Sequence, residues 1–451
     1  MYHKVLIANR GEIAVRVIRA CRELGVRTVA VYSDVDHDAL HVRMADEAEC
    51  IGPAAPRDSY CNTAAILEAA ARHHVDAIHP GYGFLAENAN FAAVCKTWGL
   101  DFIGPEPETI ERMGSKAGAR QRMSQAGVPI VPGTSGPCSE DECRSAAARI
   151  GYPVLLKAAA GGGGLGIRAV QNPDELAMAF AASRREAQAN FAEADLYLEK
   201  YLPQPRHIEF QILADRHGKV LHLFERESSM QRRRQKILEE APGPHMTETL
   251  RRAMAEAAVE AARAVHYIGA GTVEFLVDRE GNFYFIEMNT RIQVEHTVTE
   301  MTTGIDLVKA QIEIAAGIPL QIEQDAIERT GCAIEMRINA EDPQARFAPC
   351  PGTISEWSPP AGPWVRTDDG VYTGYTVQPY YDSLLCKLVV WGRDRTEAIA
   401  RARRALDEFR AAGIATTIEL HRRIVREPEF VSGIYHTGWL EENLDRLIAP
   451  Q

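Results

Sequence analysis

The chain has 451 residues, 46% of them hydrophobic and 25% charged, and a formal net charge of -12. This is too long for a single hydrophobic core, so we expect about three domains. The negative charge argues against general nucleic-acid binding, because the phosphate backbone requires a cationic surface. No stretch approaches the ~20 apolar residues of a membrane helix, and the apolar run at the N-terminus is too short for a signal peptide.

The nine cysteines are scattered along the chain and show no metal-ligand spacing such as C-x-x-C. An odd number of dispersed thiols in a long chain is typical of a reducing compartment rather than of a disulfide framework. We therefore expect a soluble, cytoplasmic enzyme whose cysteines are reduced.

The first third of the chain alternates short apolar strands with helices. Strands are expected at 5–8, 28–32 and 77–79, and helices at 14–24 and 66–72. This alternation predicts a parallel sheet with helices on both faces, whose ligands lie beyond the carboxyl ends of the strands. ANRGE (8–12) and HPGYGFLAEN (79–88) follow strands in this way. Neither is the G-x-G-x-x-G dinucleotide fingerprint, which argues against a nicotinamide cofactor.

A glycine run in KAAAGGGGLGIR (157–168) follows a predicted helix at 139–149. Short apolar strands at 153–157 and 167–170 flank it, so we expect a hairpin with a mobile tip. In a Walker A loop the lysine follows the glycines and a helix comes next, whereas here Lys157 precedes them and a strand follows. Open backbone N–H groups and the lysine charge suit a phosphate ligand. A flexible loop without a ligand is the alternative.

Two glutamates are expected to face each other on a second hairpin. Its strands are predicted at 271–277 and 282–288. We expect Asp278 to pair with Phe283. This register places Glu274 opposite Glu287, with Cβ atoms only ~5 Å apart, and Asn289 joins the same face. Two carboxylates and an amide oxygen suit Mg²⁺, whereas solvated glutamates on an exposed hairpin are the alternative.

The alternation of polar and apolar residues continues after this hairpin. If the chain stays extended, Asn289, Arg291, Gln293 and Glu295 share one face. Arginine can hold a small planar anion through two hydrogen bonds, and glutamate can act as a base. The basic run RRRQK (232–236) either contributes to this anion pocket or forms a solvated loop.

Beyond residue 150 the predicted strands become longer and more typical of antiparallel pairing. From about residue 331 we expect strands at 332–338 and 385–390 and a helix at 396–411. The chain shows no internal repeat. The predicted fold class is therefore α/β at the start and α+β afterwards.

Seven segments of the chain resemble biotin carboxylase, in the order found in that family. They are IANRGEIA (7–14), HPGYGFLAEN (79–88), KAAAGGGG (157–164), EKYL (199–202), SMQRRRQK (229–236), FIEMNTRIQVEH (285–296) and RINAEDP (337–343). The resemblance covers essentially the entire chain and implies an ATP-grasp fold. It implies an N-terminal Rossmann-like domain over 1–114, an ATP-grasp domain over 115–330 with a lid at about 130–203, and a C-terminal biotin carboxylase domain over 331–451.

The resemblance also implies a role for each matching residue. ATP would contact Lys116, Lys157, the backbone of Gly163 and Gly164, the adenine hinge Glu199, Lys200, Tyr201 and Leu202, the ribose contact His207, and Gln231 and Arg234. Glu274, Glu287 and Asn289 would hold Mg²⁺ or Mn²⁺. Lys236, Arg291, Gln293 and the Val294 backbone would hold bicarbonate. Glu295 would act as the base, and Arg337 would stabilise the biotin enolate.

Three positions depart from the family pattern. Arg234 stands where histidine is usual, Leu165 where lysine or arginine is usual, and Thr297 where proline is usual. Arginine keeps the charge of histidine but is longer and does not titrate. These departures affect the expected ATP affinity and lid movement more than the expected reaction.

The expected reaction is ATP- and bicarbonate-dependent carboxylation of biotin. The chain ends at Gln451 without an Ala-Met-Lys-Met biotinylation motif. We therefore expect the biotin carboxyl carrier protein and the carboxyltransferase to be separate chains, and the resemblance implies a homodimer. The alternatives are a catalytically silent paralogue that acts as a scaffold or regulator, and another ATP-grasp ligase.

Overall fold

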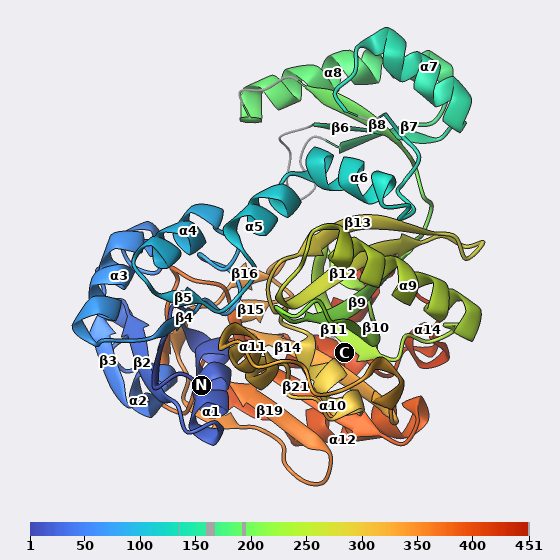
Figure 1. The fold of residues 1–451 in the computed structure, drawn as a ribbon. Helices are drawn as coiled ribbons and strands as arrows, with labels where there is room; N and C mark the ends of the chain where they lie inside the picture. The colour runs from blue at the N-terminus through green and yellow to red at the C-terminus, as the bar shows by residue number, and fades with distance from the viewer. Residues whose placement is uncertain (135, 159–166, 192–194, 450–451) are drawn as a thin grey trace.

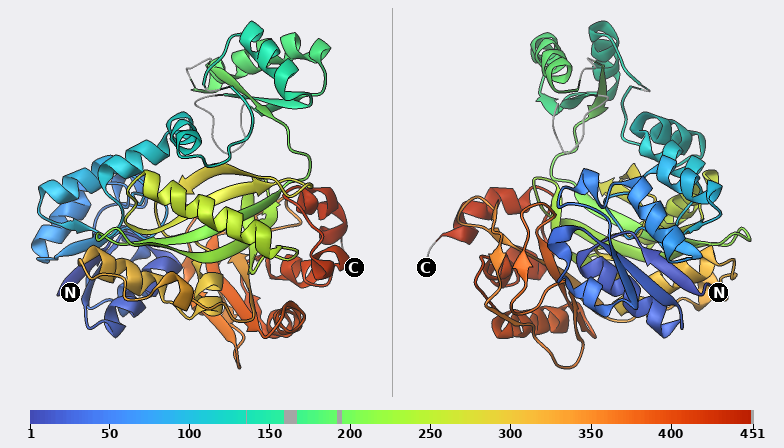
Figure 2. Two further views of the ribbon diagram at one scale, coloured as in Figure 1. Left: turned by 45° about the vertical axis from the view of Figure 1, so that its right-hand side comes forward. Right: turned by 90° about the vertical axis from the view of Figure 1, so that its left-hand side faces the viewer.

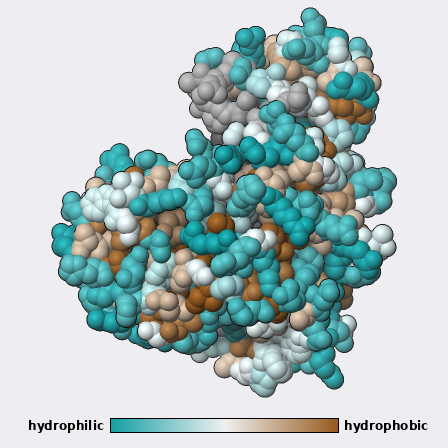
Figure 3. Space-filling model, in the orientation of Figure 1, coloured by the Kyte–Doolittle hydropathy of each residue, from teal (hydrophilic) through white to brown (hydrophobic). Residues whose placement is uncertain are grey.

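The computed structural model describes residues 1–134, 136–158, 167–191 and 195–449. A large body carries a small lobe that stands away from it (Figure 1). The chain enters the lobe after helix α6 (Lys116–Gln125) and leaves it through residues 201–205. The surface is largely hydrophilic, and the small lobe projects from the body (Figure 3). No helix in the described ranges is long and apolar enough to span a bilayer.

The N-terminal part contains a five-stranded parallel sheet in the order β3-β2-β1-β4-β5. Its strands are β1 (Lys4–Ile7), β2 (Arg27–Tyr32), β3 (Glu47–Cys50), β4 (Ala77–His79) and β5 (Asp101–Phe102). Its helices are α1 (Gly11–Glu23), α2 (Leu40–Met44), α3 (Thr63–Arg72), α4 (Ala89–Thr97) and α5 (Pro107–Gly114), with short 3-10 turns at Asp34–Asp36 and Pro56–Asp58. The predicted parallel sheet is confirmed.

The alternation of side chains along β1 explains why helices cover both faces of this sheet. Val5 and Ile7 share a core with α1, whereas Leu6 and Ala8 pack in a separate core with α3 and α4. Every residue of β1 after Lys4 is buried. A continuous apolar run of this kind is characteristic of a parallel strand that is covered on both sides.

The small lobe is an antiparallel sheet, β7-β6-β8, covered by two helices. The strands are β6 (Val154–Ala158), β7 (Ile167–Val170) and β8 (Leu196–Lys200), and the helices are α7 (Glu140–Ile150) and α8 (Pro173–Phe191). Val154 and Leu156 face the helices, so Leu155 and Lys157 face the opposite way, toward the body. The strands of the expected hairpin are present, but its glycines lie outside the described residues.

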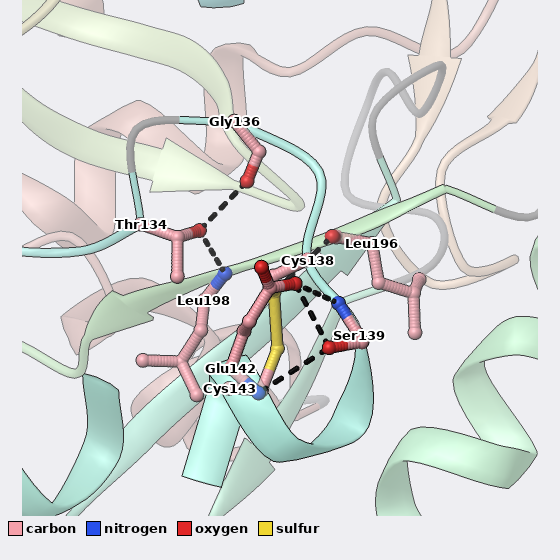
Figure 4. The surroundings of a disulfide bond; sticks show 8 residues. All are labelled: Thr134, Gly136, Cys138, Ser139, Glu142, Cys143, Leu196 and Leu198. Atoms are coloured by element: carbon pink, nitrogen blue, oxygen red, sulfur yellow. Dashed lines mark hydrogen bonds between the residues drawn. A yellow bond between two sulfur atoms is a disulfide. The ribbon is translucent and has the colours of Figure 1, made fainter. Parts of the chain in front are cut away.

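A disulfide between Cys138 and Cys143 joins the segment before α7 to the first turns of that helix (Figure 4). The expectation that all cysteines are reduced is therefore wrong for this pair. Ser139 begins the helix with a capping box to Glu142, and this turn brings the two Cα atoms within 6.0 Å. Spacing alone gave no sign of the pair, because the local fold creates the contact.

The body is built on an eight-stranded antiparallel sheet in the order β13-β12-β9-β10-β11-β14-β21-β19. Its first five strands along the chain are β9 (Arg206–Ala214), β10 (Val220–Arg232), β11 (Gln235–Ala241), β12 (Gly269–Val277) and β13 (Phe283–Asn289). The accompanying helices are α6 (Lys116–Gln125), α9 (Glu248–Ala264), α10 (His296–Thr303) and α11 (Leu307–Ala315). Figure 2 shows α9 lying across one face of this sheet.

Strand β9 shows how the sheet separates its core from its polar face. Ile208, Phe210 and Ile212 pack in the core formed with α9. The residues between them, His207 and Glu209 among others, therefore point to the opposite face. That face is turned toward the small lobe.

The C-terminal part continues the same sheet through β14 (Cys332–Asn339), β21 (Leu384–Gly392) and β19 (Val365–Asp369). Short strands are β15 (Glu341–Asp342), β16 (Ala348–Pro349), β17 (Gly352–Thr353), β18 (Glu356–Ser358), β20 (Thr376–Val377) and β22 (Arg410–Ala412). The helices are α12 (Arg395–Glu408), α13 (Ile418–Ile424), α14 (Pro428–Ser432) and α15 (Trp439–Ile448), and a 3-10 turn covers Gln324–Ala326.

The helix predicted at 396–411 is too long at its C-terminal end. α12 ends at Glu408, and Arg410–Ala412 pairs with β18 instead. Phe409 adopts an extended conformation and is buried against Trp357, with ring centroids 5.1 Å apart. This aromatic contact and the strand pairing end the helix, although the sequence Arg-Ala-Ala is compatible with a helix.

Candidate active site

A cavity of about 1120 Å³ lies where the small lobe, the N-terminal sheet and the central sheet meet. Seventeen of the predicted site residues line it: Lys157, Glu199, Lys200, Tyr201, Leu202, His207, Gln231, Arg234, Lys236, Glu274, Glu287, Asn289, Arg291, Gln293, Val294, Glu295 and Arg337. Gly163, Gly164 and Leu165 lie outside the described residues. Lys116 is the first residue of α6, and its side chain lies outside the described part of the structure.

Glu274 and Glu287 are directly paired across β12 and β13, as predicted. The register expected near the turn is wrong, however, because Phe283 pairs with Val277 rather than with Asp278. A register shift between Glu274 and Phe275 offsets this one-residue error, so the two glutamates still pair. A bulge of this kind inserts one residue into one strand. It allows Phe285 to face the core while Glu287 turns to the cavity.

Glu274 is buried and surrounded by donors. Its Oε1 accepts hydrogen bonds from Lys236 Nζ at 2.8 Å, Asn289 Nδ2 at 2.8 Å and Gln293 Nε2 at 2.6 Å. Its Oε2 lies 2.8 Å from His207 Nε2. Burial alone would raise the pKa of Glu274, but Lys236 and His207 hold it well below its usual range. Glu274 is therefore an ionised carboxylate at the centre of the cavity, with oxygen atoms of the kind that bind metal ions.

The ammonium group of Lys236 is enclosed by three carboxylates. Its Nζ lies 2.5 Å from Glu209, 2.8 Å from Glu274 and 2.7 Å from Glu295. Burial opposes the charge, but these neighbours raise the pKa of Lys236 well above its usual value. The lysine therefore stays charged and holds side chains from β9, β12 and the segment after β13 together.

Glu295 lies between two cations. Lys236 contacts its Oε1, and Arg337 Nη2 donates to its Oε2 at 2.9 Å. Burial would raise the pKa of Glu295, but Lys236 and Arg337 lower it far below the usual value. The carboxylate is therefore ionised, as a base must be before it takes a proton.

The expected extended segment from Asn289 to Glu295 is wrong. β13 ends at Asn289, and Glu295, the residue before α10, has φ and ψ of -79° and 10°, which is not an extended conformation. The backbone N–H of Thr290 donates to Glu87 at 3.0 Å, and Arg291 Nε donates to the same carboxylate at 2.9 Å. These bonds to Glu87 replace strand pairing. The polar side chains still reach one cavity because the segment curves around it.

Glu199 on β8 holds two cations where the small lobe joins the body. Arg120 Nη1 donates to its Oε1 at 2.6 Å, and Lys157 donates to its Oε2. The backbone N–H of Lys200 donates to Pro132 at 2.7 Å. Lys157, which was predicted to contact phosphate, is thus ion-paired in this structure, close to the predicted adenine hinge.

His207 and Gln231 form a pair behind Glu274. Gln231 Nε2 lies 2.9 Å from His207 Nδ1 and donates to the Ser228 carbonyl at 2.7 Å. Because the Gln231 amide donates to Nδ1, the proton of a neutral His207 resides on Nε2, which faces Glu274. Glu274 raises the pKa of His207 even though burial lowers it.

The basic run at 232–236 divides into an exposed turn and a buried lysine. Arg233 and Arg234 form the turn between β10 and β11, with φ values of 47° and 66°, and both are exposed. Lys236 follows on β11 and points into the cavity. The run therefore supplies one cation to the carboxylate cluster, and Arg234 at the cavity rim.

Sequence reasoning missed Glu209, which is fully buried beside Lys236. Its ligand atom lies within 4.8 Å of those of His207 and Glu274, a group able to hold a metal ion. In RHIEFQILA (206–214), polar residues alternate with apolar ones. This alternation was a visible signal for a polar face on β9.

A second missed pair, Glu239 and Glu335, lies behind Arg337. Arg337 Nη2 is 2.5 Å from Glu239, and burial raises the pKa of Glu239 to about 7. Burial also raises the pKa of Glu335, which accepts a hydrogen bond from Thr297. Thr297, one of the departures from the family pattern, thus partners a buried carboxyl group that a proline would leave without this donor.

The donor set of the cavity suits a hard divalent cation. Glu274 and Glu287 are paired across adjacent strands, and Asn289 adds an amide two residues after Glu287. Carboxylate and amide oxygens are the usual ligands of Mg²⁺. The residues therefore fit the predicted metal.

The fold and the cavity define the class of protein: a two-helix lobe stands over an antiparallel sheet with cations and carboxylates between them, as in an ATP-grasp ligase. Three family models match the chain: "Biotin carboxylase, N-terminal domain" at 1–110, "Carbamoyl-phosphate synthase L chain, ATP binding domain" at 115–323 and "Biotin carboxylase C-terminal domain" at 335–442. The chain belongs to the biotin carboxylase family.

Individual relatives are similar over nearly the whole chain. Biotin carboxylase of Nostoc sp. is 55% identical over 98% of this chain and 99% of its own. Biotin carboxylase 1 of Bacillus subtilis is 54% identical over 98% of this chain and 98% of its own. The biotin carboxylase domain dimer of Hydrogenobacter thermophilus 2-oxoglutarate carboxylase, solved with MgADP, ADP and bicarbonate, is 49% identical, with a TM-score of 0.93 and full coverage of both chains.

Proposed function

We propose that this protein uses ATP and bicarbonate to carboxylate biotin on a separate carrier protein. The observation that carries the proposal is the cluster of Lys236, Glu295 and Arg337 in one cavity with the paired Glu274 and Glu287. It combines cations for an anionic substrate, an ionised base and a carboxylate pair for a metal. The MgADP and bicarbonate of the Hydrogenobacter relative support this assignment.

ATP lies between the small lobe and the central sheet. Its adenine contacts the segment from Glu199 to Leu202, and His207 reaches the ribose. Its phosphates are held by Lys116, Lys157 and the backbone of Gly163 and Gly164, with Gln231 and Arg234 nearby. Lys157 then exchanges its bond to Glu199 for a phosphate oxygen, which is a charge-assisted contact of similar kind.

Glu274, Glu287 and Asn289 hold Mg²⁺, or Mn²⁺ in its place. The ion supplies positive charge that neutralises the transferring phosphoryl group. The protein contributes the fixed geometry of two adjacent strands, which the bulge in β13 provides.

Bicarbonate is held by Arg291, Gln293, Lys236 and the Val294 backbone. Glu295 removes its proton, and a bicarbonate oxygen attacks the γ-phosphorus of ATP to give carboxyphosphate and ADP. Carboxyphosphate breaks down to CO₂ and phosphate, and the phosphate removes the ureido proton of biotin. Arg337 stabilises the resulting enolate, which attacks CO₂. Closure of the lobe keeps water from the short-lived mixed anhydride.

Two other functions use the same fold. A different ATP-grasp ligase has no need of Arg337, the proposed enolate-stabilising residue, beside Glu295, the proposed base. Both residues are present here and contact each other. A silent paralogue acting as a scaffold or regulator finds support only in the departures at Leu165 and Arg234. Neither departure removes a proposed metal ligand or the base.

Phosphate release from ATP separates the three functions. With Mg²⁺ and bicarbonate, the protein is expected to release phosphate at a rate that free biotin increases. Phosphate release that is unaffected by biotin would indicate another ligase, and no release would indicate a silent paralogue. Heat-denatured protein controls for background hydrolysis.

The carrier protein, the carboxyltransferase and a second copy of this chain are the proposed partners. Affinity purification from the source cell is expected to recover a biotinylated chain together with this one. Covalent biotin on a lysine of this chain would overturn the separate-carrier proposal. The mass of the purified protein in solution tests the homodimer.

A further inference from the structure

A fully buried arginine lies beneath the cavity floor. Arg226 on β10 has no exposed surface and does not line the cavity. Its Nε donates to Glu209 at 2.6 Å, and its Nη1 donates to Gln211 at 2.6 Å and Thr299 at 3.0 Å. Its Nη2 donates to Thr272 at 3.0 Å and Gln293 at 2.8 Å. A guanidinium has five N–H donors, so every donor of Arg226 is used.

The bond to Gln293 fixes which end of that amide faces the cavity. Arginine has no acceptor, so the atom that faces Arg226 must be the amide oxygen. The other end, Nε2, therefore points to the cavity, where it donates to Glu274 at 2.6 Å. The opposite orientation would place two donors against each other in a buried site, which is costly.

Arg226 also acts on Lys236 through Glu209. By holding Glu209 Oε1 at 2.6 Å, it leaves Oε2 for Lys236 at 2.5 Å. Both carboxylate oxygens of this fully buried residue are thus paired with cations. Removal of Arg226 would leave Glu209 Oε1 buried without its cationic partner.

We propose that Arg226 is a positioning residue that makes the proposed bicarbonate site present hydrogen-bond donors. It turns the Gln293 amide so that its N–H groups face the anion, and it steadies Lys236 through Glu209. The inference rests on the proposed function, because Gln293 and Lys236 are the proposed bicarbonate ligands. It adds a residue that touches neither substrate nor metal.

Lysine is not an adequate substitute at this position. The planar guanidinium spans strands β9 and β12, helix α10 and the segment after β13 at once, whereas an ammonium is a compact point charge on a shorter reach. Arg226→Lys keeps the buried positive charge beside Glu209, so the variant is expected to fold. It loses the fixed orientation of Gln293.

The test measures the KM for bicarbonate and the KM for ATP in biotin-stimulated phosphate release. Arg226→Lys is expected to raise the KM for bicarbonate by about tenfold or more, the size of one hydrogen bond to a charged group, and to change the KM for ATP much less. Arg251→Lys is the matched control, because Arg251 is also buried and bonded to a glutamate, Glu225, at 2.9–3.0 Å. It lies outside the cavity, and both KM values are expected to stay unchanged.

A double-mutant cycle with Gln293→Ala shows whether Arg226 acts through Gln293. We expect Gln293→Ala to raise the KM for bicarbonate and the added Arg226→Lys change to raise it much less than in the wild type. Equal effects in both backgrounds, or an equal rise in the KM for ATP, would overturn the inference while leaving the bicarbonate site in place. If Gln293→Ala has no effect, the proposed bicarbonate site is itself wrong, and the inference falls with it.

Discussion

At the scale of single residues, Glu295 is held ionised by cations on both of its oxygens. Glu295→Gln keeps the shape of the side chain but removes its charge and its capacity to accept a proton, and it turns an amide NH2 group toward Lys236 or Arg337. Bicarbonate-dependent phosphate release is expected to fall roughly 10²–10⁴-fold, the usual contribution of a general base. Steady-state assays at saturating ATP measure this.

The control for this variant is Glu323→Gln. Glu323 is an exposed glutamate paired with Lys219 on the surface, so its neutralisation is expected to leave the rate unchanged. A Glu295→Gln protein that is folded and retains the wild-type rate would show that another group accepts the proton.

His41 links burial to the pH dependence of stability. It is fully buried, with Nε2 3.3 Å from the Val31 carbonyl, and burial lowers its pKa from 6.5 to about 4. The folded protein therefore binds this proton less readily than the unfolded chain. The stability that depends on neutral His41 is present above pH ~6.5 and is lost as the pH falls toward about 4.

We predict that the stability advantage of wild type over His41→Gln shrinks by about 1.4 kcal/mol for each pH unit between ~6.5 and about 4. Urea unfolding midpoints of both proteins across this range provide the measurement. Using the difference between the two proteins cancels the titration of other groups. A difference independent of pH would show that the pKa of His41 is the same in the folded and unfolded states.

At the scale of elements, the bulge in β13 creates the proposed metal site. In a regular strand Phe285 and Glu287 would share a face, and one of them would be misplaced. The inserted residue lets the aromatic ring fill the core under α9 while the carboxylate joins Glu274. One short strand thus supplies an apolar side chain to the core and a carboxylate to the cavity.

The lobe helix α7 gives a prediction about thiols. Seven of the nine cysteines are free, and Cys138 and Cys143 are bonded. Alkylation of the denatured protein is expected to modify seven thiols without reductant and nine with it. Nine modified thiols in the absence of reductant would contradict the bonded pair.

At the scale of the whole molecule, the ATP-grasp and C-terminal parts share one sheet. β11 pairs with β14, so the predicted boundary near residue 331 falls between two neighbours in a continuous sheet. This continuity places Arg337 on β14 beside Glu295. The site therefore depends on all parts of the chain being folded together.

The sequence predicted the parts of this site that depend on local patterns. The apolar strands and the opposed glutamates have short-range signals, and the strands on either side of the glycine run paired as expected. The turn after Asn289 and the end of α12 depend on distant partners, Glu87 and β18. The bond between Cys138 and Cys143 depends on the local turn into α7, which residue spacing does not reveal. Arg226 carried no signal, because its role arises only when four elements meet.

The most direct test of the proposed reaction follows oxygen from bicarbonate into phosphate. If a bicarbonate oxygen attacks the γ-phosphorus, it becomes the bridging oxygen of carboxyphosphate. That oxygen stays with phosphorus when the C–O bond breaks. The protein would be incubated with ATP, Mg²⁺, free biotin and ¹⁸O-labelled bicarbonate in unlabelled water. We predict phosphate that carries one bicarbonate oxygen, whereas phosphate without label would contradict the account.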